Sequence, residues 1–112
     1  MERELYLSIL YDYYHTMLTD RQREIFDLYY NQNLSLGEIA EELEISRQGV
    51  RDSLMKAEKT MHELEANLRI SEKNNEISTV LEELAKDLSA IPMSMMQKKR
   101  ILEKLNEINE II

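Results

Sequence analysis

The chain of 112 residues contains no cysteine, a single proline and only two glycines. Without cysteine there can be no disulfide bonds or thiolate metal sites, and this composition fits a reducing cytoplasm. Because proline and glycine disfavour helices while leucine, glutamate and methionine favour them, the composition predicts an all-α protein. No run approaches the roughly 18 uncharged apolar residues of a membrane span, and no basic-then-apolar leader opens the chain. We therefore expect a cytoplasmic protein with no membrane span.

Basic residues are also scarce. The chain has 22 acidic against 14 basic residues and a formal net charge of −8, so as a whole it repels polyphosphate at long range. The segment 46–60 reverses this balance, with four basic residues, Arg47, Arg51, Lys56 and Lys59, against Asp52 and Glu58. The acidity of the remainder disfavours tight nucleic-acid binding by the chain alone.

Residues 34–54 have the pattern of a helix-turn-helix motif. Ser35 and Glu38 form an S-x-x-E capping box, which marks the start of a short helix. Residues 44–45 form the turn, and Ser46 is placed to cap a second helix. The positions where the two helices would cross are apolar: Ile39, Ala40, Leu43, Ile45, Val50 and Leu54. In such a motif the second helix usually reads the major groove of DNA.

Two residues of the motif are unusual for their places. Glu44 lies in the turn, where many such motifs use glycine for a positive φ angle, so this pattern indicates either mild strain or a different turn. Gly49 lies inside the second helix at a cost of about 1 kcal/mol relative to alanine. We interpret it as a place of close helix–helix packing rather than of close approach to a ligand.

Two further helices are predicted before the motif. The first spans about residues 4–16, and the second begins at a Thr19–Gln22 capping box and runs to about residue 30. The first has a broad apolar stripe formed by Leu5, Ile9, Leu10, Tyr13, Tyr14 and Met17. The second would pack through Ile25, Leu28 and Tyr29, before a polar loop at 31–33. The second motif helix should continue past Leu54 on the same face, through Ala57, Met61, Leu64 and Leu68.

The sequence predicts two domains, a helix-turn-helix domain over residues 1–70 and a C-terminal helical hairpin over residues 71–112. The first hairpin helix ends before Pro92, and the second begins at a Ser94–Gln97 capping box. Each helix has one apolar seam, formed by Ile77, Leu81, Leu84, Leu88 and Ile91 in the first and by Ile101, Leu105, Ile108 and Ile112 in the second. A hairpin with one apolar face per helix must pack on the first domain or on another chain. The terminal Ile111 and Ile112 favour a homodimer.

The candidate nucleic-acid-binding residues are Arg47, Gln48, Arg51 and Lys56. Arginine pairs bidentately with guanine and glutamine with adenine, and the first three share an exposed face of the second motif helix. The alternative is the solvated face of a purely structural helix-turn-helix. Asp52, next to Arg51, favours that alternative because it can repel phosphate or neutralise the arginine.

Nothing in the sequence predicts an enzyme. The two histidines, His15 and His62, have no partners at metal-ligand spacing, and no nucleophile, base and oxyanion site can be assembled. We expect no catalytic residue, no metal and no cofactor.

The segment 18–30, followed by Ser35–Ala40 and Ser46–Arg51, resembles region 4 of bacterial sigma factors, the module that reads promoter DNA. The resemblance covers about residues 18–68. It aligns Arg47, Gln48 and Arg51 with outward positions of the recognition helix. It also aligns Thr19, Arg21 and Arg23 with the start of the preceding supporting helix.

The complete chain resembles the YlxM-type family of small bacterial helix-turn-helix proteins, through its tyrosine-rich first helix, sigma-like core and charged helical tail. That resemblance implies a cytoplasmic, non-enzymatic regulatory protein, linked by neighbouring genes to the signal recognition particle. Its expected partners are the particle's protein or RNA components. The alternative is a sequence-specific DNA-binding transcription regulator that dimerises through the C-terminal hairpin.

Overall fold

A computed structural model describes residues 2–112, which form six α-helices, one short 3-10 helix, one short π-helix and no strand. The α-helices are α1 (Glu2–Tyr14), α2 (Asp20–Phe26), α3 (Leu36–Leu43), α4 (Arg47–Leu68), α5 (Ile70–Ser89) and α6 (Met95–Ile111). The 3-10 helix η1 spans His15–Met17, and the π-helix η2 spans Asp27–Asn31. The prediction of an all-α fold is confirmed for this part of the chain.

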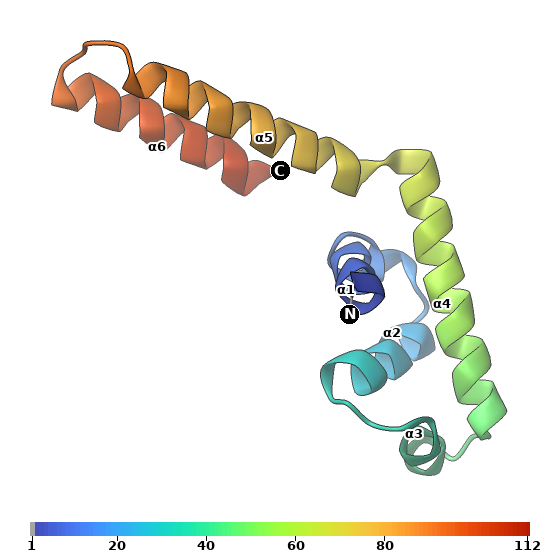
Figure 1. Ribbon diagram of the computed structural model, residues 1–112. Helices are drawn as coiled ribbons and strands as arrows, with labels where there is room; N and C mark the ends of the chain where they lie inside the picture. The colour runs from blue at the N-terminus through green and yellow to red at the C-terminus, as the bar shows by residue number, and fades with distance from the viewer. Residues whose placement is uncertain (1) are drawn as a thin grey trace. The chain divides into compact units, whose positions relative to one another are not determined.

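Two compact units divide the chain, Met1–Ser71 and Glu72–Ile112. The first contains the helix-turn-helix, in which α1, α2 and α3 lie along one side of the long helix α4 (Figure 1). The second contains most of α5 and all of α6, which run antiparallel side by side.

The two motif helices begin as their capping residues predict. The Ser35 hydroxyl accepts a hydrogen bond from the Glu38 amide at 3.1 Å, and the Glu38 carboxylate accepts one from the Ser35 amide at 3.1 Å. The Ser46 hydroxyl accepts from the Gly49 amide at 2.9 Å and so caps α4. Glu44 adopts the left-handed conformation with φ of 57°, which the sequence indicated as one of two possibilities. In the turn between α3 and α4, Glu44 therefore adopts a backbone conformation that glycine adopts more readily.

Apolar side chains from α1 to α4, with the turns between them, form the core of the first unit. Helix α4 contributes four residues at spacings of four, three and four, which place them on one face: Val50, Leu54, Ala57 and Met61. The other buried apolar residues are Leu7, Leu10, Tyr14, Leu18, Ile25, Phe26, Leu28, Ile39 and Ala40. Leu43 and Ile45 of the motif are half-buried against this core.

The predicted apolar stripe of the first helix is mostly wrong. Leu5 and Met17 are 65% and 57% exposed, and Ile9 and Tyr13 are also exposed. Leu10 and Tyr14 are buried as predicted, and the third buried residue of α1 is Leu7, which the prediction missed. Helix α1 has apolar or tyrosine side chains on almost every side, so its pattern did not single out the face that contacts α4.

The second helix departs from the prediction in its last turn. The Thr19–Gln22 capping box is present, with hydrogen bonds of 3.0 and 3.1 Å. The α-helix ends at Phe26, however, and continues as the π-helix η2. Ile25 and Leu28 are buried as predicted, Tyr29 is only half-buried, and Phe26 is a core residue that the prediction missed.

Two expectations about α4 need correction. Leu68 is exposed, because the buried face of α4 ends at Glu65. A side-chain carbon added at Gly49 would lie 3.2 Å from the Ser46 hydroxyl and 4.0 Å from Ile45, residues of the preceding turn. Gly49 therefore relieves crowding at the helix cap rather than between two packed helices.

A buried hydrogen-bond network joins α1 to the end of α4. The Tyr14 hydroxyl donates to the Glu65 carboxylate at 2.6 Å and accepts from the Ile70 amide at 3.3 Å, while the Ser71 amide donates to Glu65 at 3.1 Å. Burial, together with the bond to Glu65, raises the pKa of the Tyr14 hydroxyl, which therefore stays a donor at neutral pH. The network satisfies a buried carboxylate where Arg69 takes the left-handed conformation between α4 and α5.

In the second unit α5 and α6 meet along a narrower seam than predicted. Its half-buried apolar members are Leu81, Ala85, Leu88, Ile101, Leu105 and Ile112. Four predicted seam residues, Ile77, Leu84, Ile91 and Ile108, are exposed instead. The small side chains of Ser78 and Ala85 let α6 approach α5 on that side, and the Ser78 hydroxyl donates to Asn109 at 3.1 Å. The ending of α5 before Pro92 and the Ser94–Gln97 capping box are confirmed.

The left-handed turn generates the first prediction. Glu44→Gly should raise the free energy of unfolding by about 1 kcal/mol, because glycine adopts positive φ without the clash of a Cβ atom. The matched control is Glu42→Gly, two residues earlier and within α3, which should lower the free energy of unfolding by about 1 kcal/mol. Urea denaturation followed by circular dichroism measures both. If both variants lose stability equally, the turn at Glu44 is not strained.

The buried network generates the second prediction. Tyr14→Phe removes the donor to Glu65 while keeping the ring, and should lower the free energy of unfolding by about 1–3 kcal/mol. Tyr6→Phe is the control, because Tyr6 is exposed and its ring stacks on His62 without needing the hydroxyl. Equal stability of both variants, measured by urea denaturation, would show that the network contributes nothing.

Candidate nucleic-acid interface

A hollow of about 460 Å³ lies between the first turn of α3 and the first turns of α4. Its lining residues are Ser35, Leu36, Gly37, Arg47, Gln48 and Arg51. The structure thus brings together three of the four residues that the sequence singled out. Ser35, Leu36 and Gly37 were not predicted as part of this surface, because their sequence signal was that of a helix start.

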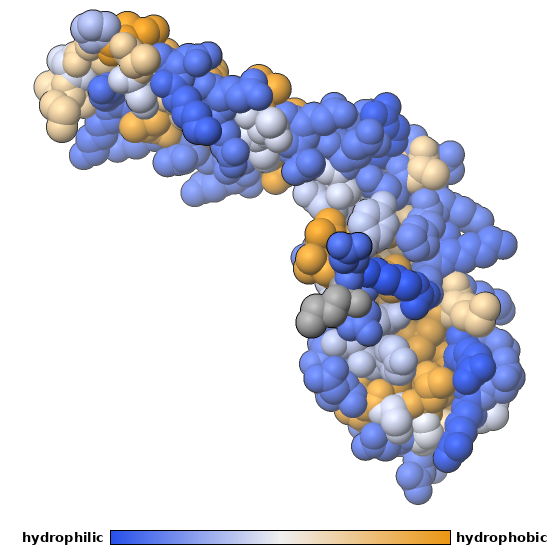
Figure 2. Space-filling model, in the orientation of Figure 1, coloured by the Kyte–Doolittle hydropathy of each residue, from blue (hydrophilic) through white to orange (hydrophobic). Residues whose placement is uncertain are grey.

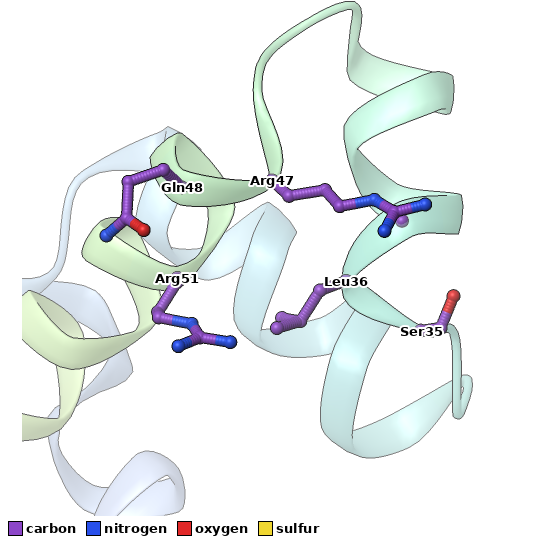
Figure 3. Close-up of a pocket in the computed structure, with 6 residues that line it drawn as sticks. Ser35, Leu36, Arg47, Gln48 and Arg51 are labelled. Atoms are coloured by element: carbon purple, nitrogen blue, oxygen red, sulfur yellow. The ribbon is translucent and has the colours of Figure 1, made fainter.

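The Arg47 side chain reaches across the hollow to α3 (Figure 3). A side-chain carbon built at Gly37 would lie 3.0 to 3.2 Å from the Arg47 guanidinium atoms, so the guanidinium rests directly against the Gly37 backbone. Arg51 follows one turn later and points into the same gap beside Leu36 (Figure 3). Within residues 2–112 neither arginine makes an ion pair, and both are exposed. Two full positive charges therefore face solvent at one place.

Gln48 lies on the side of α4 away from Arg47, and its amide nitrogen donates to the Asp52 carboxylate at 2.8 Å (Figure 3). Asp52 thus engages the glutamine, not the neighbouring Arg51 as the sequence suggested. A glutamine held by a carboxylate keeps its amide oxygen free to accept, while one of its two N–H donors is occupied.

Lys56 stands apart from the other three candidates. It is exposed on α4 but does not line the hollow. Nine residues separate it from Arg47, which turns its side chain by roughly 180° around the helix. A ligand that binds Arg47 and Arg51 would therefore not contact Lys56 from the same side of α4.

The residues that the sigma-factor resemblance aligned with the supporting helix have structural contacts in this chain. Thr19 caps α2. The Arg23 guanidinium pairs with Asp20 and donates to the backbone carbonyls of His15 and Leu18. Arg21 lies 4.0 Å from Glu24. These contacts hold the turn between α1 and α2.

Acidic side chains lie next to the hollow on α3. Hydrogen bonds from the Ser35 amide and hydroxyl lower the pKa of Glu38, which therefore stays ionised at neutral pH. Glu41 and Glu42 follow it on the same short helix, and both are exposed. On its α3 side the hollow is therefore bordered by carboxylates, while Arg47 and Arg51 supply its positive charge from the start of α4.

The profile of the family UPF0122, described as "Putative helix-turn-helix protein, YlxM / p13 like", matches residues 1–108. The chain belongs to this family. It is 42% identical over 107 residues to the UPF0122 protein of Thermoanaerobacter sp. (strain X514), covering 96% of this chain and 88% of that one. The UPF0122 protein of Clostridium perfringens (strain 13 / Type A) is 39% identical over 109 residues, with 96% and 97% covered. That of Acetivibrio thermocellus is 38% identical over 116 residues, with 98% and 99% covered.

Family membership confirms the resemblance of the complete chain to the YlxM-type family. The family's description is that of a helix-turn-helix protein and not of a known class of enzyme. Among residues 2–112 no group of three or more acidic or histidine side chains is placed to hold a metal ion. Over the same residues no helix is both long and apolar enough to cross a membrane.

The contact between Gly37 and Arg47 generates the third prediction. Gly37→Ala should displace the exposed guanidinium by a few tenths of an ångström while raising the free energy of unfolding by up to about 1 kcal/mol, because alanine favours the helix. The chemical shift of the Arg47 side-chain Nε–H group should change, and that of Arg51 should change less. An unchanged Arg47 signal would mean that the guanidinium does not rest on Gly37.

Proposed function

We propose that this chain is a non-enzymatic regulatory protein that contacts nucleic acid through the first turns of α4. The observation that carries the proposal is the pair Arg47 and Arg51, exposed, without ion-pair partners among residues 2–112, and lining one hollow. No carboxylate among residues 2–112 neutralises either guanidinium group. The planar guanidinium groups of arginine suit bidentate contacts with phosphate or guanine.

The family resemblance favours the signal recognition particle as the target, with its RNA as the component that a positive surface would engage. A surface of two arginines is small, and the chain is acidic overall, so we expect moderate affinity. Because the major groove of an RNA helix is deep and narrow, contact would be made at loops, bulges or exposed phosphates rather than by inserting α4 into a groove. A protein component of the particle would then supply the rest of the affinity.

The motif geometry supports a second candidate, a regulator that binds a defined DNA duplex. A helix of 22 residues that begins with Arg47 and Gln48 presents its first turns as recognition helices do. Gln48 keeps an acceptor and one donor for a base edge. Specific regulators of this kind bind their sites about a thousandfold or more tighter than random duplex.

Titration of the purified chain into labelled nucleic acids separates these candidates. Fluorescence anisotropy would compare signal-recognition-particle RNA, an RNA of the same length and shuffled sequence, and random duplex DNA at physiological salt. Preference for the particle RNA, or calorimetric binding to its protein component, supports the leading proposal. A duplex selected from a random library that binds in the nanomolar range supports the second candidate instead.

The fourth prediction tests the surface itself. Arg47→Ala combined with Arg51→Ala should leave helical circular dichroism unchanged and weaken nucleic-acid binding. Each lost phosphate contact should reduce the logarithmic salt slope by about 0.7 to 0.9. Lys56→Ala is the matched control, because it removes one positive charge from α4 outside the hollow. If the double variant binds as the parent does, or no more weakly than Lys56→Ala, the surface is assigned wrongly.

A further inference from the structure

The hairpin of the second unit leaves a regular apolar stripe of α5 in solvent. No residue of α5 or α6 is buried. On α5 the exposed large apolar residues are Ile77, Val80 and Leu84, at 41, 60 and 43%. Two helices that meet only through half-buried side chains gain little from packing on each other to offset the cost of ordering them. The hairpin therefore needs a further partner. Figure 2 shows apolar surface on it amid hydrophilic side chains.

The spacing of the stripe identifies the kind of partner. Lys73, Ile77, Val80, Leu84 and Asp87 follow one another along α5 at spacings of four, three, four and three. This is the repeat by which one α-helix packs along another α-helix at a shallow angle. The stripe lies beside the seam that contacts α6, so a second helix can cover it without disturbing the hairpin. A shallow hollow lined by Glu76, Ile77, Val80 and Leu81 lies on it.

The charged residues at the two ends of the stripe would be complementary between two antiparallel copies of α5. Lys73 is basic and Asp87 acidic, and neither makes an ion pair with any residue of 2–112. Fourteen residues separate them, about 21 Å along the helix, so they cannot pair within one chain. If two copies of α5 pack antiparallel with the two-fold axis near Val80, Lys73 of each copy lies beside Asp87 of the other. A parallel arrangement would place like charges together.

We propose that α5 is the interface of a two-fold homodimer in which two hairpins pack antiparallel through this stripe. Ile77, Val80 and Leu84 of both copies form its centre, and two Lys73–Asp87 pairs flank the centre. The proposal specifies the face and direction of the interface, and it does not depend on whether the first unit binds nucleic acid.

Sedimentation of the full chain at tens of micromolar tests the apolar centre. The unmutated chain should be a dimer, and Leu84→Asp should shift it to a monomer while retaining most helical circular dichroism. Met96→Asp is the matched control, because Met96 is 84% exposed on α6 and lies outside the stripe. The Met96→Asp variant should remain a dimer. A monomeric unmutated chain overturns the proposal, as does equal dissociation by the control.

A charge exchange tests the antiparallel direction, and it is the fifth prediction. Lys73→Glu and Asp87→Lys should each raise the dimer dissociation constant by about tenfold, because each converts two attractive pairs into repulsive ones. The double variant restores opposite charges across the interface and should return the constant to within a factor of about two to three of the original. Failure of the double variant to recover would contradict the antiparallel arrangement, since no contact within one helix could produce that rescue.

Discussion

Burial of one face of α4 is the constraint on which the first unit depends. Val50, Leu54, Ala57 and Met61 are buried, and α1, α2 and α3 all pack against this helix. The core of the unit is therefore organised around α4, whose 22 residues make it long enough to contact three shorter helices. The same helix begins with Arg47 and Gln48. Its apolar face thus holds the unit together while its first turns remain free for a ligand.

Much of this arrangement could be predicted from the sequence, namely the helix starts marked by capping boxes and the buried face of α4. Ser35, Thr19 and Ser94 each sit three residues before a glutamate or glutamine, and all three capping boxes form. A capping box is read from side chains three positions apart, so it depends little on the rest of the fold. The buried face of α4 was also predictable, because charged residues separate its apolar positions clearly.

The buried faces of helices were predicted wrongly where polar residues did not separate one apolar face from the others. Apolar and tyrosine side chains surround α1, and its buried face is set by contacts with distant residues, such as the Tyr14–Glu65 hydrogen bond between residues 51 positions apart. In α5 the seam turned toward Ser78 and Ala85, because small side chains allow close approach although they contribute little apolar area. Among the candidate binding residues, the face of Arg47 and Arg51 followed from helical spacing. The part played by Gly37 did not, since it depends on how α3 crosses α4.

The two arginines at the start of α4, which have no ion-pair partners among residues 2–112, have a consequence for how an encounter with a polyanion begins. A charged ligand feels the protein's field before it touches any atom, over a distance of about 8 Å at physiological ionic strength. The net charge of −8 repels a polyanion at long range, whereas Arg47 and Arg51 attract it once it is near the hollow. Collisions in the wrong orientation are therefore rejected early, and those that persist already face the hollow. The acidity of the chain lowers the rate at which a polyanion meets the protein, and it also favours some orientations of approach over others.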